Sequence, residues 1–478
     1  MWDKEVNRMK RIAYFLLISV LITSCTGDSL MGSHEINNDI LKPFPFTNDN
    51  IGKYNKLNFD SNHIPLLDYK DSLIYYPVQY NQVALHYYAK YYSTKSDIDK
   101  EVFLRQAEFI RNEMTAHGDF GVWECSTLIT PYRLDTPWAS SMAQGFGLGV
   151  MIQAFQLTDD ERYLNAAKLA LNSYEVDIVN GGIRNMWDGY VHYEEYADVN
   201  SHVLNGYIFS LGGLYYCYKN TNDEKAYKLF IEGVNSLAVK LKDYDAGFTS
   251  FYSMITQTGQ YPYDSAIGSR PDHYHELVVN QLITLYLWTN NIVFYEYAYK
   301  FYQQDLGLFY DYKLPNKFQD IEATHTVVPK THGVDNLLNA NWTYGNYWST
   351  NRFPTELILD LGEVKTDITK LVLYALSSET LPNDFEIYVY NDNKWDFANK
   401  LNDILRTHET KFQTRHHKTI VKEYDLFGNF EAEKIKIKFL SSNGEYVALR
   451  NINLLFNRRK EFDNLIELVK NQQFIYTK

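Results

Sequence analysis

A run of titratable and hydroxyl side chains, HYEEYADVNSHVLNGY at residues 192–207, stands directly before an apolar stretch that begins at Val203. It opens with a His, two Tyr and two Glu residues. One interpretation is a solvated loop that leads into a helix, with Asn200 or Ser201 as the N-cap. The other is a catalytic rim, because carboxyl and phenol groups placed side by side can transfer protons to and from a substrate.

The composition limits the classes of protein to which the chain can belong. Its 478 residues, 45% of them hydrophobic, are enough for two or three domains of about 150 residues. The net charge of -13 argues against nucleic-acid binding, which needs clustered Lys and Arg. The 41 Tyr residues suit surfaces that stack on sugar rings, although helical repeats also use Tyr as packing. Neither a phosphate loop nor zinc-ligand spacing is found, so we expect no cofactor and no metal.

The N-terminus has the pattern of a secretory signal. A basic pair precedes the apolar run 12–22, which is too short to span a bilayer as a helix. The run ends in Ile-Thr-Ser-Cys, which resembles a bacterial lipobox and predicts lipidation of Cys25; the alternative is an ordinary signal peptide with an incidental Cys. We expect residues 1–25 to be a lipoprotein signal peptide and 26–63 to be a tether. The protein would then be a membrane-anchored bacterial lipoprotein, periplasmic or at the cell surface.

Helical periodicity dominates the chain between about residues 80 and 306. Apolar residues recur at helical spacing in eight blocks that come in pairs, with short polar breaks inside the pairs and longer connections between them. This pattern is typical of stacked αα-hairpins and predicts an α/α toroid over residues 64–310, whose inner helices line a cleft. The connections between hairpins meet at one end of a toroid, so the stretch 192–207 would lie where a catalytic rim is built.

The period changes near Pro315. Later segments such as ELILDL and KIKIKFL alternate with period two, which predicts an antiparallel β-sandwich over residues 316–458. This segment resembles discoidin-like domains of the galactose-binding jelly-roll type. The resemblance rests on Asn341-Trp342, Tyr347-Trp348-Ser349 and residues 357–362 and 384–390. Such modules either bind sugars or support an adjacent catalytic domain, and both roles stay open. Residues 459–478 predict a short amphipathic helix.

A set of motifs in residues 138–282 is similar to the catalytic domain of D-glucuronyl C5-epimerases, the enzymes that convert glucuronate into iduronate within heparan-type chains. The motifs are WASSMAQG at 138–145, YEEY at 193–196, VLNG at 203–206, YDAG at 244–247 and Tyr274-His275 ahead of 280–282. The resemblance implies a Glu-Tyr catalytic pair and two later catalytic tyrosines. The pair falls on Glu195 and Tyr196, and the later tyrosines fall on Tyr252 and Tyr274.

The implied reaction explains these residue types. Epimerisation removes the C5 proton beside a carboxylate and returns one to the opposite face, so it needs an acid/base group on each side of the ring. A Tyr is a strong base once deprotonated and an acid when neutral. Glu195 is either one partner or sets the protonation of its neighbour. The substrate carboxylate also needs cations or aligned donors as charge develops. The candidates by position are Gln144, Arg184, Asn205, Arg270 and His275.

The chain departs from the family pattern after its second tyrosine set. Where the family reads Tyr-Asp-Leu-Arg-His, residues 252–256 read Tyr-Ser-Met-Ile-Thr, which removes a cation and an imidazole near the expected carboxylate or sulfate. One extra residue also separates Arg270 from Tyr274. The anionic polysaccharide that we expect as the partner is therefore not identified, and neither is the oligomeric state.

Three other interpretations use the same residues. A polysaccharide lyase shares the abstraction of the C5 proton and then eliminates at C4. A non-catalytic, surface glycan-binding lipoprotein would use the aromatic side chains without turnover. A glycoside hydrolase needs two carboxylates that flank the scissile bond, whereas Glu194 and Glu195 are adjacent and would point differently.

Overall fold

The computed structural model describes residues 41–47, 51–54, 56–128, 132, 134–245, 250–254, 274–304, 318–338, 346–402, 406–413 and 418–471. The predicted signal peptide, the lipidation of Cys25, the tether up to residue 40 and the predicted ligand Arg270 lie outside these residues. Within the described ranges, no helix combines the length and the apolar character that a membrane crossing requires.

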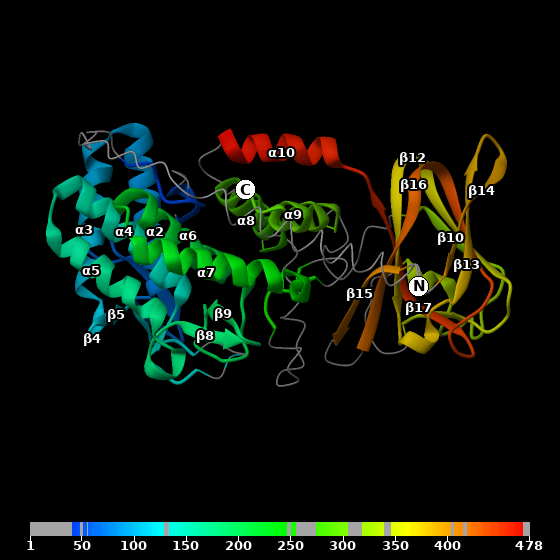
Figure 1. Cartoon of the computed structure of the whole chain (residues 1–478), viewed down its shortest axis with the longest axis horizontal. Helices are drawn as coiled ribbons and strands as arrows, with labels where there is room; N and C mark the ends of the chain where they lie inside the picture. Colours follow the sequence, from blue (N-terminus) through cyan, green and yellow to red (C-terminus); the bar gives the residue numbers. More distant parts are fainter. Residues whose placement is uncertain are drawn as a thin grey trace, which may run out of the picture. The chain divides into compact units, whose positions relative to one another are not determined.

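Helical hairpins form the first part of the fold (Figure 1). The pairs are α2 (Pro77–Thr94) with α3 (Asp97–Asn112), α4 (Ser141–Thr158) with α5 (Glu161–Asn172), α6 (Leu204–Thr221) with α7 (Glu224–Lys240), and α8 (Tyr274–Thr289) with α9 (Ile292–Gln304). Each of the eight apolar blocks in the sequence falls on one of these helices, so the prediction of paired helices is confirmed.

The breaks inside the hairpins are short because two adjacent residues end one helix and begin the next. Asp159 and Asn222 adopt the left-handed conformation at the C-caps of α4 and α6. Asp160 and Asp223 follow directly, and each carboxylate accepts a backbone N–H in the first turn of the next helix. The Thr-Asp-Asp and Thr-Asn-Asp sequences therefore encode tight turns.

The inner helices stack in a row. α2 contacts α4, α4 contacts α6, and α6 contacts α8. The backbones of α4 and α6 approach closely at Gly145 and Gly213, where a Cβ on Gly213 would lie only 2.5 Å from the Cα of Gly145. These contacts define a row of helices and do not by themselves show its closure. The α/α toroid therefore stays a prediction.

The packed part of the chain begins before residue 64, where the predicted tether was to end. Phe44 and Phe46 are buried. The ring of Phe44 lies 5.8 Å from that of Phe146 on α4, and the ring of Phe46 lies 5.5 Å from that of Phe209 on α6. The prediction was wrong here because two aromatic residues in a polar segment produce no periodicity.

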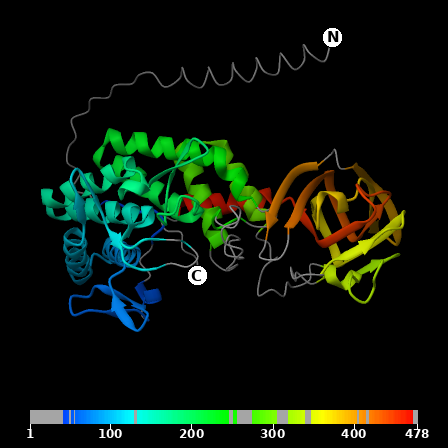
Figure 2. The ribbon, with the colours of Figure 1, turned by 90° about the horizontal axis from the view of Figure 1, so that it is seen from below.

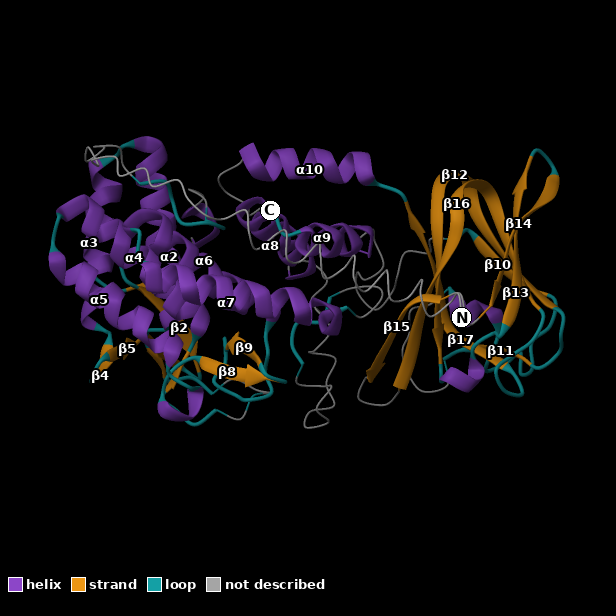
Figure 3. Cartoon of the chain, viewed as in Figure 1, coloured by secondary structure: helices purple, strands orange, loops and turns teal. Residues whose placement is uncertain are grey.

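Short β-strands and 3-10 turns lie in the segments before and between the helices (Figure 3). The strands are β1 (Asn58–Phe59), β2 (Pro65–Tyr69), β3 (Ser72–Ile74), β4 (Thr115–His117), β5 (Phe120–Val122), β6 (Glu124–Cys125), β7 (Trp138–Ala139), β8 (Arg184–Trp187) and β9 (Tyr190–Tyr193). The 3-10 turns are η1 (Ile51–Tyr54), η2 (Ser173–Glu175), η3 (Ile178–Asn180) and η4 (Leu241–Tyr244). The strands β4 to β9 all lie in connections between hairpins, where the sequence placed the catalytic rim.

The second part is an antiparallel β-sandwich, as predicted (Figure 2). Its strands are β10 (Asp320–Ala323), β11 (Trp348–Thr350), β12 (Thr355–Ala375), β13 (Asp384–Asn391), β14 (Lys394–Asn402), β15 (Arg406–Gln413), β16 (Lys418–Phe439) and β17 (Val447–Phe456), with turns η6 (Val334–Leu337) and η7 (Ser378–Thr380). The long strands β12 and β16 each contribute to both layers. The first half of β12 pairs with β10 and the second half of β16, and its second half pairs with β17 and the first half of β16.

The C-terminal helix α10 (Arg459–Asn471) returns to the helical hairpins after the sandwich. Phe462 is fully buried, and its ring lies 5.3–5.4 Å from the rings of Tyr295, Tyr299 and Tyr302 on α9. The guanidinium of Arg459 lies 4.0 Å from the centre of the Tyr299 ring. The sequence predicted the helix but gave no sign of this docking.

A buried ion-pair network also joins α9 to the sandwich. The Nζ atom of Lys300 lies 2.5 Å from Asp245 and 3.0 Å from Glu423 on β16. Both carboxylates are almost fully buried. Burial disfavours the charged amine, but the two carboxylates together raise the pKa of Lys300. Removing one member of such a network costs about 3–5 kcal/mol, because the remaining charge is left buried and unpaired.

The α10 docking predicts the effect of a single truncation. Phe462→Ala is expected to lower the free energy of unfolding by about 3–5 kcal/mol, because a fully buried ring is replaced by a cavity. Leu468→Ala in the same helix is the control, since Leu468 is 52% exposed and its loss should change stability by less than about 0.5 kcal/mol. Urea unfolding measures both. Equal stability of the two variants would contradict the docked position of α10.

Candidate active site

Glu195 lies in the connection between β9 and α6, where three hairpin ends meet. Tyr252 follows the turn η4, and Tyr274 opens α8. Backbone hydrogen bonds join the first two segments: the N–H of Leu204 donates to the carbonyl of Tyr252 at 3.0 Å, and the N–H of Met254 donates to that of Ser201 at 3.0 Å. Residues distant in the sequence are thus fixed beside one another.

The structure brings together all four predicted catalytic residues. The hydroxyl oxygens of Tyr196 and Tyr252 lie 3.3 Å apart. The rings of Tyr252 and Tyr274 have centres 5.0 Å apart. Hydrogen bonding from the Tyr196 and Tyr252 hydroxyls lowers the pKa of Glu195, although Oε2 of Glu195 has no hydrogen-bond partner of normal geometry among the described residues. A carboxyl group and a phenol pair therefore lie together, which is the arrangement that proton transfer needs.

Burial sets the protonation of this group. The side chain of Glu195 is buried, and this raises its pKa to about 7; the negative charge of Glu194 acts in the same direction, while the two phenol hydrogen bonds lower it. Burial and the charge of Glu195 raise the pKa values of Tyr196 and Tyr252 well above 10. Near neutral pH, Glu195 exchanges its proton readily, whereas the two phenols are neutral proton donors.

A glycine leaves space for the Glu195 carboxyl. Gly206 lies in the first turn of α6, and a Cβ placed on it would lie 2.0 Å from Oε2 of Glu195. Any larger residue at this position has to displace the carboxyl. This contact gives the VLNG motif a physical function, since its glycine admits the side chain of the YEEY motif.

Two tyrosines of the site were missed in the sequence. The ring of Tyr132 stacks on that of Tyr196, with centres 4.2 Å apart. Tyr76, at the N-cap of α2, belongs to the same apolar cluster, and its pKa is raised by burial, with smaller contributions from Cys125, Glu195 and Tyr274. The available signal was their position in connections between predicted helices, but many of the 41 tyrosines share that property.

Two predicted substrate ligands have structural roles instead. Gln144 is fully buried; its Oε1 accepts the N–H of Trp123 at 3.0 Å, and its Nε2 donates to the carbonyl of Gly121 at 3.0 Å. His275 accepts the N–H of Ser250 at Nδ1 and lies 2.9 Å from the carbonyl of Phe301 through Nε2. Burial lowers the pKa of His275 to about 4, so it is neutral. Both side chains are occupied, which corrects the prediction.

The remaining predicted ligands differ. Arg184 lies 3.5 Å from Asp177 and 3.6 Å from Glu232, so its charge is balanced by two carboxylates and its described contacts do not reach Glu195. Asn205 is next to Gly206 at the start of α6 and is buried, and its Oδ1 has no hydrogen-bond partner among the described residues. Asn205 therefore stays a candidate for the substrate site.

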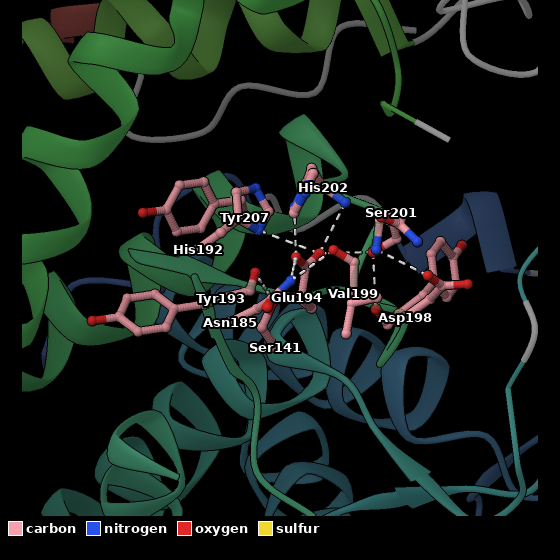
Figure 4. A network of polar contacts seen from close by, with 12 residues as sticks. Ser141, Asn185, His192, Tyr193, Glu194, Asp198, Val199, Ser201, His202 and Tyr207 are labelled. Atoms are coloured by element: carbon pink, nitrogen blue, oxygen red, sulfur yellow. Dashed lines mark hydrogen bonds and ion pairs between the residues drawn. The ribbon is translucent and has the colours of Figure 1, made fainter. Parts of the chain in front are cut away.

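The neighbouring carboxyl, Glu194, points into a pair of imidazoles (Figure 4). Its Oε1 lies 2.7 Å from Nδ1 of His202 and its Oε2 3.3 Å from Nδ1 of His192. Burial raises the pKa of Glu194, but the charges and hydrogen bonds of the two imidazoles outweigh this and lower it, so the group is ionised. One interpretation of the sequence made Ser201 the N-cap of α6, but the N-cap is Val203. The Ser201 hydroxyl instead lies 2.7 Å from Oε2 of Glu194.

This cluster also has the ligand types of a metal site. The ligand atoms of His192, Glu194 and His202 lie within 4.8 Å of one another, and a two-His, one-Glu set is known for zinc. The oxygens of Glu194 already accept hydrogen bonds from the Asn185 amide, the Ser201 hydroxyl and the His202 backbone N–H. That saturation favours a hydrogen-bonded carboxylate over a metal ligand at this position.

Residues 115–303 match the family model described as the D-glucuronyl C5-epimerase C-terminus, and this range contains all four predicted catalytic residues. The helical part of the chain is similar to D-glucuronyl C5-epimerases. The chain is 38% identical over 130 residues to a D-glucuronyl C5-epimerase of Caenorhabditis elegans, in an alignment that covers 24% of this chain and 21% of that protein. The chain is 28% identical over 244 residues to an uncharacterized protein of Methanocaldococcus jannaschii, in an alignment that covers 47% of this chain and 75% of that protein.

Among solved structures, the family 32 carbohydrate-binding module from Streptococcus pneumoniae EndoD aligns with 30% of this chain and 99% of its own length, at 16% identity and a TM-score of 0.23. The two sequence comparisons support a uronyl epimerase-like role for the helical part.

The contact between Gly206 and Glu195 can be tested directly. Gly206→Ala is expected to reduce turnover by about 10²-fold or more, because the added methyl group displaces an acid/base residue. Gly189→Ala is the control for a Gly replacement, because no atom lies within 4 Å of its Cβ position; its left-handed backbone makes a loss of stability, and not of turnover, the expected effect. Steady-state kinetics and thermal unfolding separate the two. Normal turnover of Gly206→Ala would contradict the geometry.

Proposed function

We propose that the protein epimerises uronic acid residues at C5 in an anionic polysaccharide, interconverting glucuronate and iduronate. The observation that carries this proposal is the buried Glu195 carboxyl, with a pKa raised to about 7, beside two neutral phenols whose oxygens are 3.3 Å apart. These groups can accept and return protons near neutral pH. The similarity of the helical part to D-glucuronyl C5-epimerases supports the same reaction.

The protonation states suggest a division of roles. Glu195, with a pKa of about 7, is the group that accepts the C5 proton in its ionised form. Tyr196 and Tyr252 are neutral and donate, so one of them supplies the proton to the opposite face of the ring. Tyr274 is 38% exposed and lies against Tyr252, where it can contact the incoming sugar.

Neutral donors replace the cation and imidazole that the chain lacks after Tyr252. Negative charge on the substrate carboxylate increases as the C5 proton leaves, and hydrogen bonds in a dry site stabilise such charge. The hydroxyls of Tyr76 and Tyr132 lie in the same aromatic cluster as Tyr196. We assign them to this role, together with backbone N–H groups.

A polysaccharide lyase is the second candidate. It would use the same base and then a phenol to protonate the leaving oxygen at C4, so the described groups support its first step equally well. The two reactions give different products, since only the lyase forms a carbon–carbon double bond that absorbs ultraviolet light.

The lipobox pattern at Cys25 supports our further proposal that a lipid anchors the protein to a bacterial membrane.

Deuterium incorporation tests the proposed reaction. Incubation with a uronate polymer in heavy water is expected to place deuterium at C5, because the returned proton comes from a side chain that exchanges with solvent. Tyr196→Phe, Tyr252→Phe and Glu195→Gln should each lower the rate by about 10²-fold or more. Tyr216→Phe is the matched control: its hydroxyl donates to the Lys42 carbonyl, and its loss should cost about 1 kcal/mol of stability and leave turnover unchanged.

Mass spectrometry and proton NMR of the recovered polymer measure the exchange. An unsaturated product without C5 exchange would assign the lyase reaction. Neither exchange nor an unsaturated product, on glucuronate, iduronate and related polymers, would favour the glycan-binding interpretation.

The raised pKa of Glu195 predicts a pH dependence of both activity and stability. If the ionised form is the base, kcat/KM should rise up to about pH 7 and be roughly 100-fold lower at pH 5. The folded-state pKa lies above 4.5, the ordinary value, so the stability that Glu195 contributes is complete below pH 4.5 and is lost as pH rises through 7. Glu195→Gln should therefore be more stable than the wild type above pH 7, by on the order of 3 kcal/mol at most. An acidic limb near pH 4.5 would contradict this assignment.

A further inference from the structure

Glu194 is a buried anion that the proposed reaction does not use. Its side chain is fully buried and accepts hydrogen bonds from two segments of the chain, β8 and residues 201–202. Asn185 of β8 donates to Oε1 at 2.7 Å, and His202 is 2.7 Å from the same oxygen through Nδ1. Ser201 lies 2.7 Å from Oε2, and the His202 backbone N–H donates to it at 2.9 Å. A buried carboxylate is tolerated only when it is satisfied in this way.

We propose that Glu194 is a positioning residue, whose carboxylate holds together the two segments that carry Glu195, Tyr196 and Tyr252. The inference rests on the proposed function, because it assigns Glu194 to the same site. It assigns a role to Glu194, which is adjacent to Glu195. That adjacency argued against the pair of flanking carboxylates that a glycoside hydrolase needs.

The backbone at Glu194 transmits its position directly to Glu195. The N–H of Glu194 donates to the carbonyl of Ile183 at 2.8 Å, and its carbonyl accepts the N–H of Ser141 at 2.9 Å. With the backbone and the side chain of residue 194 both fixed, the backbone from which residue 195 projects is fixed as well, and its carboxyl lies against Gly206. The orientation of the Glu195 carboxyl thus depends on the anchoring of its neighbour.

Ser201 connects Glu194 to the segments that carry Tyr196 and Tyr252. Its hydroxyl, next to Glu194, also lies 2.9 Å from the carbonyl of Tyr196. Its own carbonyl accepts the N–H of Met254 at 3.0 Å, two residues after Tyr252. The single hydroxyl proton of Ser201 is shared between Glu194 and the Tyr196 carbonyl, and the Ser201 carbonyl holds Met254, so Ser201 connects Glu194 to the segments of both phenols.

The imidazoles of His192 and His202, which lie beside the Glu194 carboxylate, have further contacts of their own. His192 Nε2 lies 3.1 Å from the hydroxyl of Tyr244, and this hydroxyl donates to the carbonyl of His202 at 2.9 Å. The His202 ring stacks on Trp187, with centres 4.4 Å apart and planes 8° from parallel. Each imidazole thus has a second contact that does not involve Glu194.

Glu194→Gln tests the proposal, because it keeps the shape and removes the charge and two acceptor positions. We expect kcat to fall at least tenfold while KM changes less than threefold, since the site is misaligned and not blocked. Hydrogen exchange followed by mass spectrometry should show at least tenfold faster exchange in residues 194–204 and 250–254, with α4 unchanged. Glu232→Gln is the matched control, because Glu232 is an exposed partner of Arg184, and it should change neither quantity.

Ser201→Ala is the second variant, in case Glu194→Gln does not fold. It removes one donor and is expected to give the same changes at smaller size, about threefold in kcat. Two results would overturn the proposal: unchanged kcat in both variants, or a loss of kcat without faster exchange in residues 250–254. If the wild type catalyses no C5 exchange, the proposed function fails, and the exchange rates of the two segments still decide whether Glu194 positions them.

Discussion

The pKa values of two adjacent carboxyl groups, Glu194 and Glu195, are shifted in opposite directions, and the candidate site depends on this difference. Glu194 is surrounded by imidazoles and hydrogen-bond donors, which lower its pKa. Glu195 is buried among phenols, and its pKa rises to about 7. Because both are buried, neither can relax into water, and the charge on the first increases the proton affinity of the second. Carboxyl pairs whose environments separate their pKa values are the usual source of acid/base groups at neutral pH.

The surrounding architecture follows from the need to direct these side chains apart. The β8–β9 hairpin supplies Asn185 and the backbone that fixes Glu194. The start of α6 supplies Gly206, which admits Glu195. This helix begins without a side-chain cap at Val203, since the nearby hydroxyl of Ser201 is used by the anchor instead. The missing cap costs helix α6 about 1 kcal/mol of local stability, because the Ser201 hydroxyl contacts Glu194 and does not cap the helix.

Local patterns predicted the parts of the structure that depend on local contacts. The helical blocks and the alternating strands were correct because apolar periodicity reports which face of an element is buried. The motif order predicted Glu195 and three tyrosines as a site, and the structure brings these residues together. The positions that failed depend on distant contacts: Phe44 packs on α4, Phe462 packs on α9, and Gln144 and His275 use their polar atoms on backbone groups far away in the sequence. No pattern in the chain marks such partners.

The sandwich contributes to the stability of the candidate site through an ion-pair network. Asp245, at the base of the segment that carries Tyr252, forms an isolated bridge with Ser250 and pairs with Lys300 of α9. Lys300 in turn pairs with Glu423 of the sandwich. Because both carboxylates are buried and Lys300 is only 19% exposed, the loss of Glu423 would leave Lys300 paired with Asp245 alone and weaken the support of the segment that carries Tyr252. A domain attached through buried charge behaves as part of the framework of the helical part, and a sugar-binding role would be added to that structural one.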